Sequence, residues 1–218
     1  MKKFFLMAFI AVATITGCSD DDSSTTNNPS DTVLVKKTIE SKAGQPDLTS
    51  NYTYDGNKLM LIESSDNTKI NFIYADGKLT SIEYRADGEL EQRNLYTYDS
   101  QGRLAQLVEL LFVDGDNDAD RTTFTYNSNG TVNTKLYTGN HTSQTELVDE
   151  GVVTITNGNI THYEGSEGTF TDTYDDRNAP EKNIFAVDIL NLGWIEGGMN
   201  NITQHTGSGT GDMYTKTY

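Results

Sequence analysis

The chain has few cysteines, few prolines and few positive charges among its 218 residues. One cysteine excludes a disulfide-stapled domain, and three prolines with 19 glycines exclude a collagen-like chain. Eight phenylalanines, 12 tyrosines and one tryptophan exclude a chain that is disordered throughout. The 16 lysines and arginines face 32 aspartates and glutamates, so the chain lacks the basic face that binds phosphate backbones. We therefore predict no nucleic-acid partner, and the length predicts one domain or at most two small ones.

The familiar sequence motifs of enzymes are also missing. The sequence contains no Gly-x-Ser-x-Gly elbow, phosphate-binding loop or dinucleotide fingerprint. His141, His162 and His205 are scattered, and none stands at a metal-ligand spacing from another His, Cys or acidic cluster. We predict no catalytic residues and a protein that is not an enzyme. A hydrolase stays an alternative, because a glycosidase needs only two carboxylates that face each other across a cleft.

The N-terminal segment predicts export from the cytoplasm. A cationic start with Lys2 and Lys3 precedes an apolar run, Phe4–Ile15, which is shorter than the roughly 20 residues of a membrane-spanning helix. This pattern predicts a signal peptide over residues 1–17. Its end, Thr16-Gly17-Cys18, resembles a bacterial lipobox, which implies that Cys18 is lipidated and anchors the protein to a membrane. An ordinary signal peptide with a chance cysteine is the alternative.

Residues 18–31 predict a lipidated cysteine followed by a disordered acidic tether. After Cys18 the segment has no apolar side chain that could offset the entropy of ordering it. Its first residues, Ser19, Asp20, Asp21 and Asp22, resemble the surface-export signal of Bacteroidetes lipoproteins. That resemblance implies a protein on the outer membrane that faces the cell exterior. The alternative is a solvated linker in a lipoprotein on the periplasmic face.

A short unit recurs five times in the body of the chain. An alternating strand that ends in Tyr, or in Ile in the last copy, is followed by a turn of Asp, Asn and Gly and a strand that opens with Leu, Val or Ile. Aromatic and β-branched residues two apart share one face of a strand, and Asp-Gly or Asn-Gly supplies the positive φ of a tight turn. Each unit therefore predicts a β-hairpin. The copies span residues 52–59, 72–79, 96–104, 124–132 and 153–160.

Several copies carry a second apolar residue three positions after the first. Ile62 follows Leu59 in this way, and Ile82 follows Leu79. An odd spacing places two residues on opposite faces of a regular strand. Either a bulge follows the turn or the first residue caps the end of a barrel.

Two segments resemble known families. The heptad Tyr98-Asp99-Ser100-Gln101-Gly102-Arg103-Leu104 is similar to the YD repeat of Rhs-type proteins. Residues 174–180, followed by Asn200-Asn201, resemble a Bacteroidetes lipoprotein family of unknown function that is described as porin-like in fold. This chain departs from that family at residues 178–180, where Asn-Ala-Pro replaces the usual Asn-Pro-Phe. The resemblance implies a porin-like β fold on a surface lipoprotein.

Further strands and one helix complete the predicted domain, which covers residues 32–218. Residues 33–41 predict an opening strand, and residues 201–205 and 213–218 predict a closing hairpin around a glycine-rich loop at 207–211. Residues 180–192 predict a short helix, with Pro180 near its start and Gly193 just past its end. We predict an all-β fold, an antiparallel meander of about 13 strands that forms a curved sheet or partial barrel.

One acidic segment has the composition of a calcium loop. Asp114, Asp116, Asp118 and Asp120 occupy alternate positions and resemble the start of an EF-hand loop. The pattern lacks the turn glycine and the bidentate glutamate of that motif. A weak calcium site in the millimolar range of extracellular modules is one hypothesis, and an acidic hairpin tip without metal is the other. No further cofactor is predicted.

The aromatic residues support the functional hypotheses. Trp194 is the best single candidate for a ligand contact, with core anchoring as its alternative role. The tyrosines could stack on sugar rings, but cross-strand packing explains them without a ligand. We predict a non-enzymatic surface lipoprotein that acts as a binding or scaffold module for a glycan or protein partner outside the cell. The alternative function is a glycan-binding accessory lipoprotein of a nutrient-uptake system.

Overall fold

The structure is a computed structural model that describes residues 33–166, 168–209 and 212–217, without the side chains of residues 114, 209 and 212–217. The predicted signal peptide, the lipidation site Cys18 and the export signal Ser19, Asp20, Asp21 and Asp22 lie outside the described residues. Those expectations stay predictions.

The described residues form a 14-stranded sheet with one short α-helix. Each strand pairs antiparallel with its neighbours in the chain, so the spatial order of the strands is also their sequence order. The elements are β1 (Lys37–Glu40), β2 (Leu48–Asp55), β3 (Lys58–Ser64), β4 (Thr68–Ala75), β5 (Lys78–Ala86), β6 (Glu89–Tyr98), β7 (Leu104–Leu111), η1 (Val113–Gly115), β8 (Asp118–Tyr126), β9 (Thr131–Asn140), β10 (Ser143–Thr156), β11 (Asn159–Gly165), β12 (Gly168–Asn178), α1 (Val187–Trp194), β13 (Asn200–Gly209) and β14 (Asp212–Thr217).

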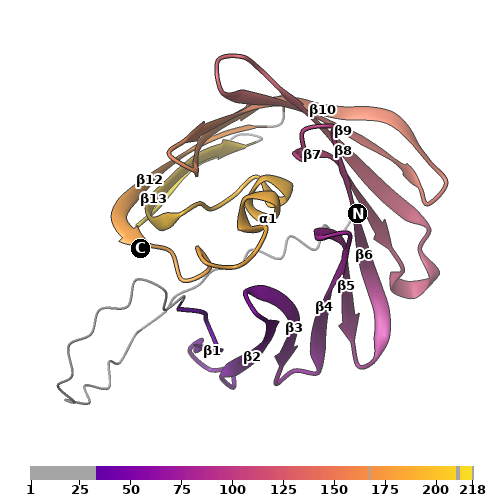
Figure 1. Cartoon of the computed structure of the whole chain (residues 1–218), viewed down its shortest axis with the longest axis vertical. Helices are drawn as coiled ribbons and strands as arrows, with labels where there is room; N and C mark the ends of the chain where they lie inside the picture. The colour runs from indigo at the N-terminus through magenta and orange to yellow at the C-terminus, as the bar shows by residue number, and fades with distance from the viewer. Residues whose placement is uncertain (1–32, 167, 210–211, 218) are drawn as a thin grey trace.

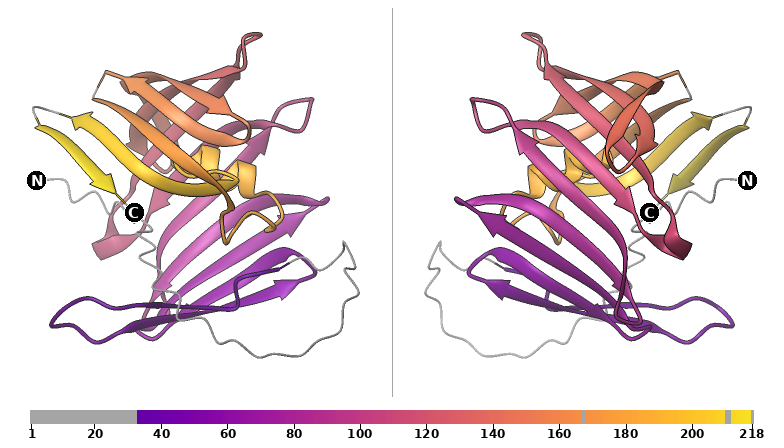
Figure 2. Two further views of the ribbon diagram at one scale, coloured as in Figure 1. Left: turned by 90° about the vertical axis from the view of Figure 1, so that its left-hand side faces the viewer. Right: turned by 90° about the vertical axis from the view of Figure 1, so that its right-hand side faces the viewer.

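The sheet curls around α1, which lies inside the curve (Figure 1). β1 and β14 are the two edge strands, and the side views show how strongly the sheet twists between them (Figure 2). The predicted all-β meander with one helix near its C-terminal end is therefore confirmed, in the form of an open curved sheet.

Each of the five sequence copies spans one hairpin. Their turns use the predicted residues: Asp76 and Gly77 have φ values of 51° and 72°, and Asn157 and Gly158 have 54° and 80°. Positive φ at two consecutive residues gives the tight turn whose twist matches that of paired strands. Local sequence is therefore sufficient to place these hairpins.

A β-bulge explains the odd spacing of apolar residues. In the β2–β3 hairpin Tyr54 pairs with Leu59, whereas Thr53 pairs with Leu61, so Met60 is an extra residue. The same shift occurs in β4–β5 and in β6–β7. The bulge turns both Leu59 and Ile62 toward the core, where they are 3% and 5% exposed. Of the two readings left open by the sequence, the structure supports the bulge.

In three of the five hairpins, the tyrosine that ends the first strand connects that hairpin to the preceding one. The hydroxyl of Tyr74 donates to the carbonyl of Leu59 at 3.0 Å, and the hydroxyl of Tyr98 donates to the carbonyl of Leu79 at 2.7 Å. Tyr126 makes the same bond, at 3.0 Å, to the first residue of β7. We call this recurrent contact the tyrosine latch.

The basic residue before each latch acceptor also contacts the next tyrosine. The Lys78 ammonium lies 5.0 Å from the centroid of the Tyr98 ring, and the Arg103 guanidinium carbon lies 4.1 Å from that of Tyr126. Such placements over a ring face are favourable cation–π contacts. The recurrence of Gly, Lys or Arg, and Leu after each turn is therefore explained by contacts between consecutive hairpins. The tyrosines have a structural role that requires no ligand.

The helix differs from its prediction. We expected residues 180–192, but α1 spans Val187–Trp194, because residues 179–186 form turns with bonds such as Ile184 N–H to the Glu181 carbonyl at 2.8 Å. Proline also suits turns, so Pro180 did not mark a helix start. Gly193 lies inside the helix, which ends at Ile195 in the left-handed conformation (φ 53°).

The closing hairpin is confirmed with longer strands than predicted. Gly207 and Gly209, which we assigned to the connecting loop, pair with Tyr214 and Asp212 in the β13–β14 ladder. Glycine is weak in strands but not excluded from them when the neighbouring strand supplies the hydrogen bonds.

Candidate functional site

The inner wall of the sheet is apolar beneath α1 and polar beyond it. On β6, the side chains of Gln92, Asn94 and Tyr96 share the inner face of the strand. Arg93 lies on the outer face, where it forms an ion pair with Glu83 at 2.7 Å. Tyr96 lies 3.7 Å from the position that a Cβ on Gly193 would occupy, so its face is the one covered by α1. The polar residues of this wall come from four neighbouring strands, β5 to β8.

We call this group the Glu109 cluster. Asn94 of β6 pairs with Glu109 of β7, and Glu109 pairs with Asp120 of β8. Asn94 is completely buried, whereas Glu109 and Asp120 keep partial contact with solvent. The members of the Glu109 cluster are Tyr84, Gln92, Asn94, Tyr96, Glu109 and Asp120.

Amide groups hold Glu109 in place. The Gln92 Nε2 group donates to Asn94 Oδ1 at 2.7 Å and to Glu109 Oε1 at 3.2 Å. Asn94 Nδ2 donates to the same Glu109 oxygen at 3.4 Å. Because both amides are fixed on a sheet, the Glu109 carboxyl is preorganised.

Burial, with a smaller effect of the neighbouring Asp120 charge, raises the pKa of Glu109 to about 7, although hydrogen bonds from Asn94 and Gln92 act in the opposite direction. Like charges directly opposite each other on paired strands repel. The Glu109 carboxyl therefore changes its charge near neutral pH, beside the carboxyl of Asp120.

Two tyrosines border the carboxyl pair. The Tyr96 side chain is 6% exposed, and among the described residues its buried hydroxyl has only a weak contact, with the Asn94 side chain. Burial, the adjacent Tyr84 and the charge of Glu109 raise its pKa well above the usual value. A buried hydroxyl with so weak a partner is costly, and a ligand that hydrogen-bonds with it would offset that cost.

Trp194, the predicted ligand contact, lies at the edge of the Glu109 cluster. Its side chain hydrogen-bonds to the hydroxyl of Tyr84, yet 39% of the residue is exposed. The last turn of α1 carries this residue over the inner wall (Figure 1). The structure thus brings Trp194 beside carboxyl and amide groups that the sequence did not single out, and its ligand role stays a prediction.

The four aspartates of the acidic segment are spread along different elements. Asp114 lies in η1, Asp116 directly follows η1, and Asp118 and Asp120 belong to β8. Among the side chains that the structure describes, which exclude that of Asp114, no group of three or more His, Cys, Asp or Glu residues could hold a metal ion. Asp120 faces Glu109 across the β7–β8 ladder. The calcium hypothesis stays a prediction.

The three histidines bind protein groups in separate places. Nε2 of His141 lies 2.6 Å from the Leu111 carbonyl oxygen, and Nδ1 of His162 lies 3.0 Å from the Thr171 hydroxyl. Nδ1 of His205 lies 2.6 Å from a carboxylate oxygen of Asp172, a residue that is 3% exposed. These contacts stabilise strands β11–β13 and the loop ends of β7 and β9.

The segments that carry the family resemblance contact each other. The Asn201 side chain donates to Asp175 Oδ2 at 3.1 Å, and its backbone N–H donates to Asp175 Oδ1 at 3.2 Å. Asn200 Nδ2 donates to the Arg177 carbonyl at 2.9 Å. The Asn-Asn pair therefore joins the end of β12 to the start of β13.

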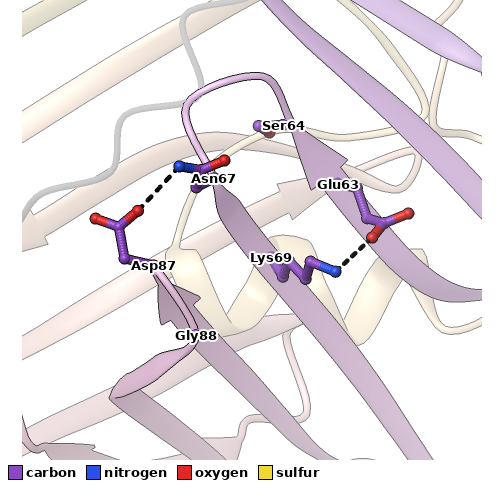
Figure 3. Close-up of a pocket in the computed structure, with 6 residues that line it drawn as sticks. All are labelled: Glu63, Ser64, Asn67, Lys69, Asp87 and Gly88. Carbon is purple, nitrogen blue, oxygen red and sulfur yellow. Dashed lines mark hydrogen bonds and ion pairs between the residues drawn. The ribbon is translucent and has the colours of Figure 1, made fainter.

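A second polar hollow lies at the turns that follow β3 and β5, with a volume of about 460 Å³ (Figure 3). Its charged groups already have partners: Lys69 pairs with Glu63 at 2.7 Å, and Asn67 donates to Asp87 at 3.0 Å. Both members of the ion pair are about half exposed, where such pairs contribute little. The Glu109 cluster is the stronger candidate, since it combines fixed amide and carboxyl groups with a buried hydroxyl that has only a weak contact among the described residues.

Fold and site together define an open antiparallel β-meander that encloses a helix and carries a polar patch on its inner wall. No protein-family model matches the chain, and no curated protein matches it. The chain is similar to a solved structure described as a porin-like protein from Bacteroides uniformis ATCC 8492, with 14% identity, 83% of this chain and 79% of that chain covered, and a TM-score of 0.44. No helix among the described residues is long and apolar enough to cross a membrane.

Proposed function

We propose that the protein is a non-enzymatic lipoprotein of the outer membrane, held by acyl chains on Cys18 and facing the cell exterior, that binds a ligand on the inner wall of its sheet. The observation that carries the binding role is the Glu109 cluster. It presents carboxyl, amide and hydroxyl groups beside the partly exposed Trp194 on a rigid sheet. Sites of this kind combine an apolar contact with a few fixed polar groups.

The arrangement of the two acids supports binding more than hydrolysis. Glu109 and Asp120 are cross-strand neighbours on one wall. A glycosidase needs an acid and a second carboxylate that flank the scissile bond from opposite sides. Side chains that project in parallel from adjacent strands are better placed to hold one ligand surface.

The anchoring and display of the protein can be tested directly. Cys18→Ala should move the protein from the membrane fraction to the soluble fraction, because the acyl chains would be absent. Proteinase added to intact cells should digest the domain if it faces outward. Retention of the Cys18→Ala variant on the membrane would contradict the anchor, and protection of the domain would favour the periplasmic alternative.

A glycan-binding accessory role in nutrient uptake is the second candidate function. It is favoured by the exposed aromatic surface of Trp194 next to hydrogen-bonding groups. Binding of a neutral oligosaccharide would support it, and binding only to an immobilised protein partner would favour a scaffold role.

Weak calcium binding at the acidic segment is a separate proposal. With a dissociation constant of about 1 mM, about 10 mM calcium would raise the free energy of unfolding by about 1.4 kcal/mol. Thermal unfolding with and without calcium measures this, and Asp116→Asn with Asp118→Asn should abolish the shift. An equal shift in the double variant would contradict the proposal.

A further inference from the structure

We propose that the Glu109 cluster is a binding site for a neutral, polyhydroxylated ligand of the saccharide class, with Trp194 packed against the apolar face of a sugar ring. The inference rests on the proposed binding function and adds the site and the ligand class to it. It is carried by the Tyr96 hydroxyl and the carboxyl pair on the inner wall of the sheet and by the exposed aromatic surface of Trp194 at the end of α1.

The hydrogen-bonding groups of the cluster match hydroxyl groups. Glu109 Oε1 already accepts from Gln92 and Asn94, which leaves the rest of the carboxyl pair to accept from ligand hydroxyls. Among the described residues the Tyr96 hydroxyl has only a weak contact with Asn94, and it can both donate and accept. A sugar hydroxyl also does both, so neighbouring hydroxyls of one ring could satisfy the carboxyl pair and the tyrosine together.

Trp194 offers carbon surface to a ligand. Its side chain hydrogen-bonds to Tyr84, but the residue remains 39% exposed. Sugars present C–H groups on one ring face, and aromatic side chains bury that face. An aromatic rim next to fixed amide and carboxyl groups is therefore suited to a ring that is apolar on its face and polar at its edge.

The carboxyl groups of the site disfavour anionic ligands, because a like charge would be held close to Glu109 and Asp120. The titratable groups that face Glu109 are Asp120 from β8, Tyr84 from β5 and Tyr96 from β6. The charge of Asp188 in α1 is directed elsewhere, because it raises the pKa values of Tyr98 in β6 and Tyr126 in β8. A neutral ligand needs no ionic partner in the site and can hydrogen-bond to Glu109 in either protonation state, and binding of a cation is one outcome of the test below.

The test uses the full-length protein and a panel of neutral oligosaccharides built from glucose, mannose, galactose or xylose. Oligosaccharides that bind on an array are titrated by calorimetry against the wild type, Trp194→Ala and Glu109→Gln. Each variant should bind at least about tenfold more weakly. Lys69→Ala, in the second polar hollow, should bind as the wild type does. Far-ultraviolet circular dichroism and the melting temperature show that each variant is folded, and Glu109→Gln keeps the size and one acceptor of the original side chain.

The pH dependence gives an independent readout. Hydroxyls donate more strongly to a carboxylate than to a neutral carboxyl, so affinity should rise between about pH 6 and pH 8 in the wild type and stay constant in Glu109→Gln. Cadaverine, a small diamine, serves as the cationic probe at low and high salt.

The outcomes separate this inference from the proposed function. Loss of oligosaccharide binding in both variants supports the site. Binding that both variants retain overturns the site while the binding function stands. No binding to any neutral oligosaccharide, with anchoring and display shown, overturns the ligand class alone. Cluster-dependent binding of cadaverine without sugar binding overturns it in favour of a cationic ligand.

Discussion

The hydroxyl of Tyr98 donates a 2.7 Å hydrogen bond to the carbonyl of Leu79, 19 residues earlier in the chain. The same ring lies beneath the Lys78 ammonium. The residues that make the repeated unit recognisable in the sequence are therefore the residues that join one hairpin to the next.

Removal of a latch hydroxyl should destabilise the fold. Tyr98→Phe deletes a bond to a buried strand and should lower the free energy of unfolding by about 1 kcal/mol. Tyr54→Phe is the matched control, because the buried Tyr54 hydroxyl has no hydrogen-bond partner among the described residues and its removal should be neutral or slightly stabilising. Urea unfolding of both variants measures the difference, and equal losses would contradict the latch.

Glu109→Gln should stabilise the protein at alkaline pH. The folded-state pKa of about 7 lies above the usual value of 4.5, so the native state binds more protons between these values, and the free energy of unfolding falls as pH rises through that window. The variant should match the wild type near pH 5 and exceed it by about 1 to 3 kcal/mol near pH 8.

Chemical denaturation at several pH values measures this difference. Glu63→Gln, which alters an exposed ion pair, should show no such gain at alkaline pH. A Glu109→Gln curve that runs parallel to that of the wild type at every pH would contradict a buried, neutral Glu109.

Two glycines should respond to alanine in opposite directions. A Cβ on Gly151 would lie 2.5 Å from the Tyr163 ring, whose hydroxyl is bonded to Asp149, so Gly151→Ala should cost about 1 to 3 kcal/mol. A Cβ on Gly193 would meet Leu107 at 3.5 Å, an ordinary contact, and alanine favours helices, so Gly193→Ala should gain about 0.5 to 1 kcal/mol. The melting temperature should fall in Gly151→Ala and rise in Gly193→Ala. A change in the same direction in both variants would contradict the packing described.

His205→Ala should leave a buried carboxylate without its partner. Burial raises the pKa of Asp172, and His205 lowers it, so removal of the histidine should destabilise the protein by about 3 kcal/mol at neutral pH. The loss should shrink in acid, where Asp172 becomes protonated. Addition of Asp172→Asn should recover part of the stability, and a pH-independent loss would indicate packing of the ring alone.

The hairpins could be predicted because their information is local. Tyrosine at alternating positions and Asp-Gly or Asn-Gly turns act within a few residues of each other. The start of α1 was predicted incorrectly because Pro180 suits a turn as well as a helix, and the packing of Val187 and Leu190 against the sheet decides between them.

The Glu109 cluster could not be predicted in the same way. Asn94, Glu109 and Asp120 come from three strands, and their register depends on bulges and turns between them. One signal was present: Gln92 and Asn94 share the inward face of β6 with Tyr96, and polar residues at inward positions of a strand mark a site or a structural network. The sequence also does not distinguish a buried acidic residue from one that is exposed to solvent.

The strands follow one another in the sheet in the same order as in the chain, and this order affects how the protein folds. Every ladder joins consecutive strands, so ordering one hairpin requires closure of only a short loop of chain. Low contact order favours rapid folding, and folding can extend along the chain from any hairpin that forms first. We therefore expect that a chain emerging from a membrane pore can fold progressively, before its last strands have appeared.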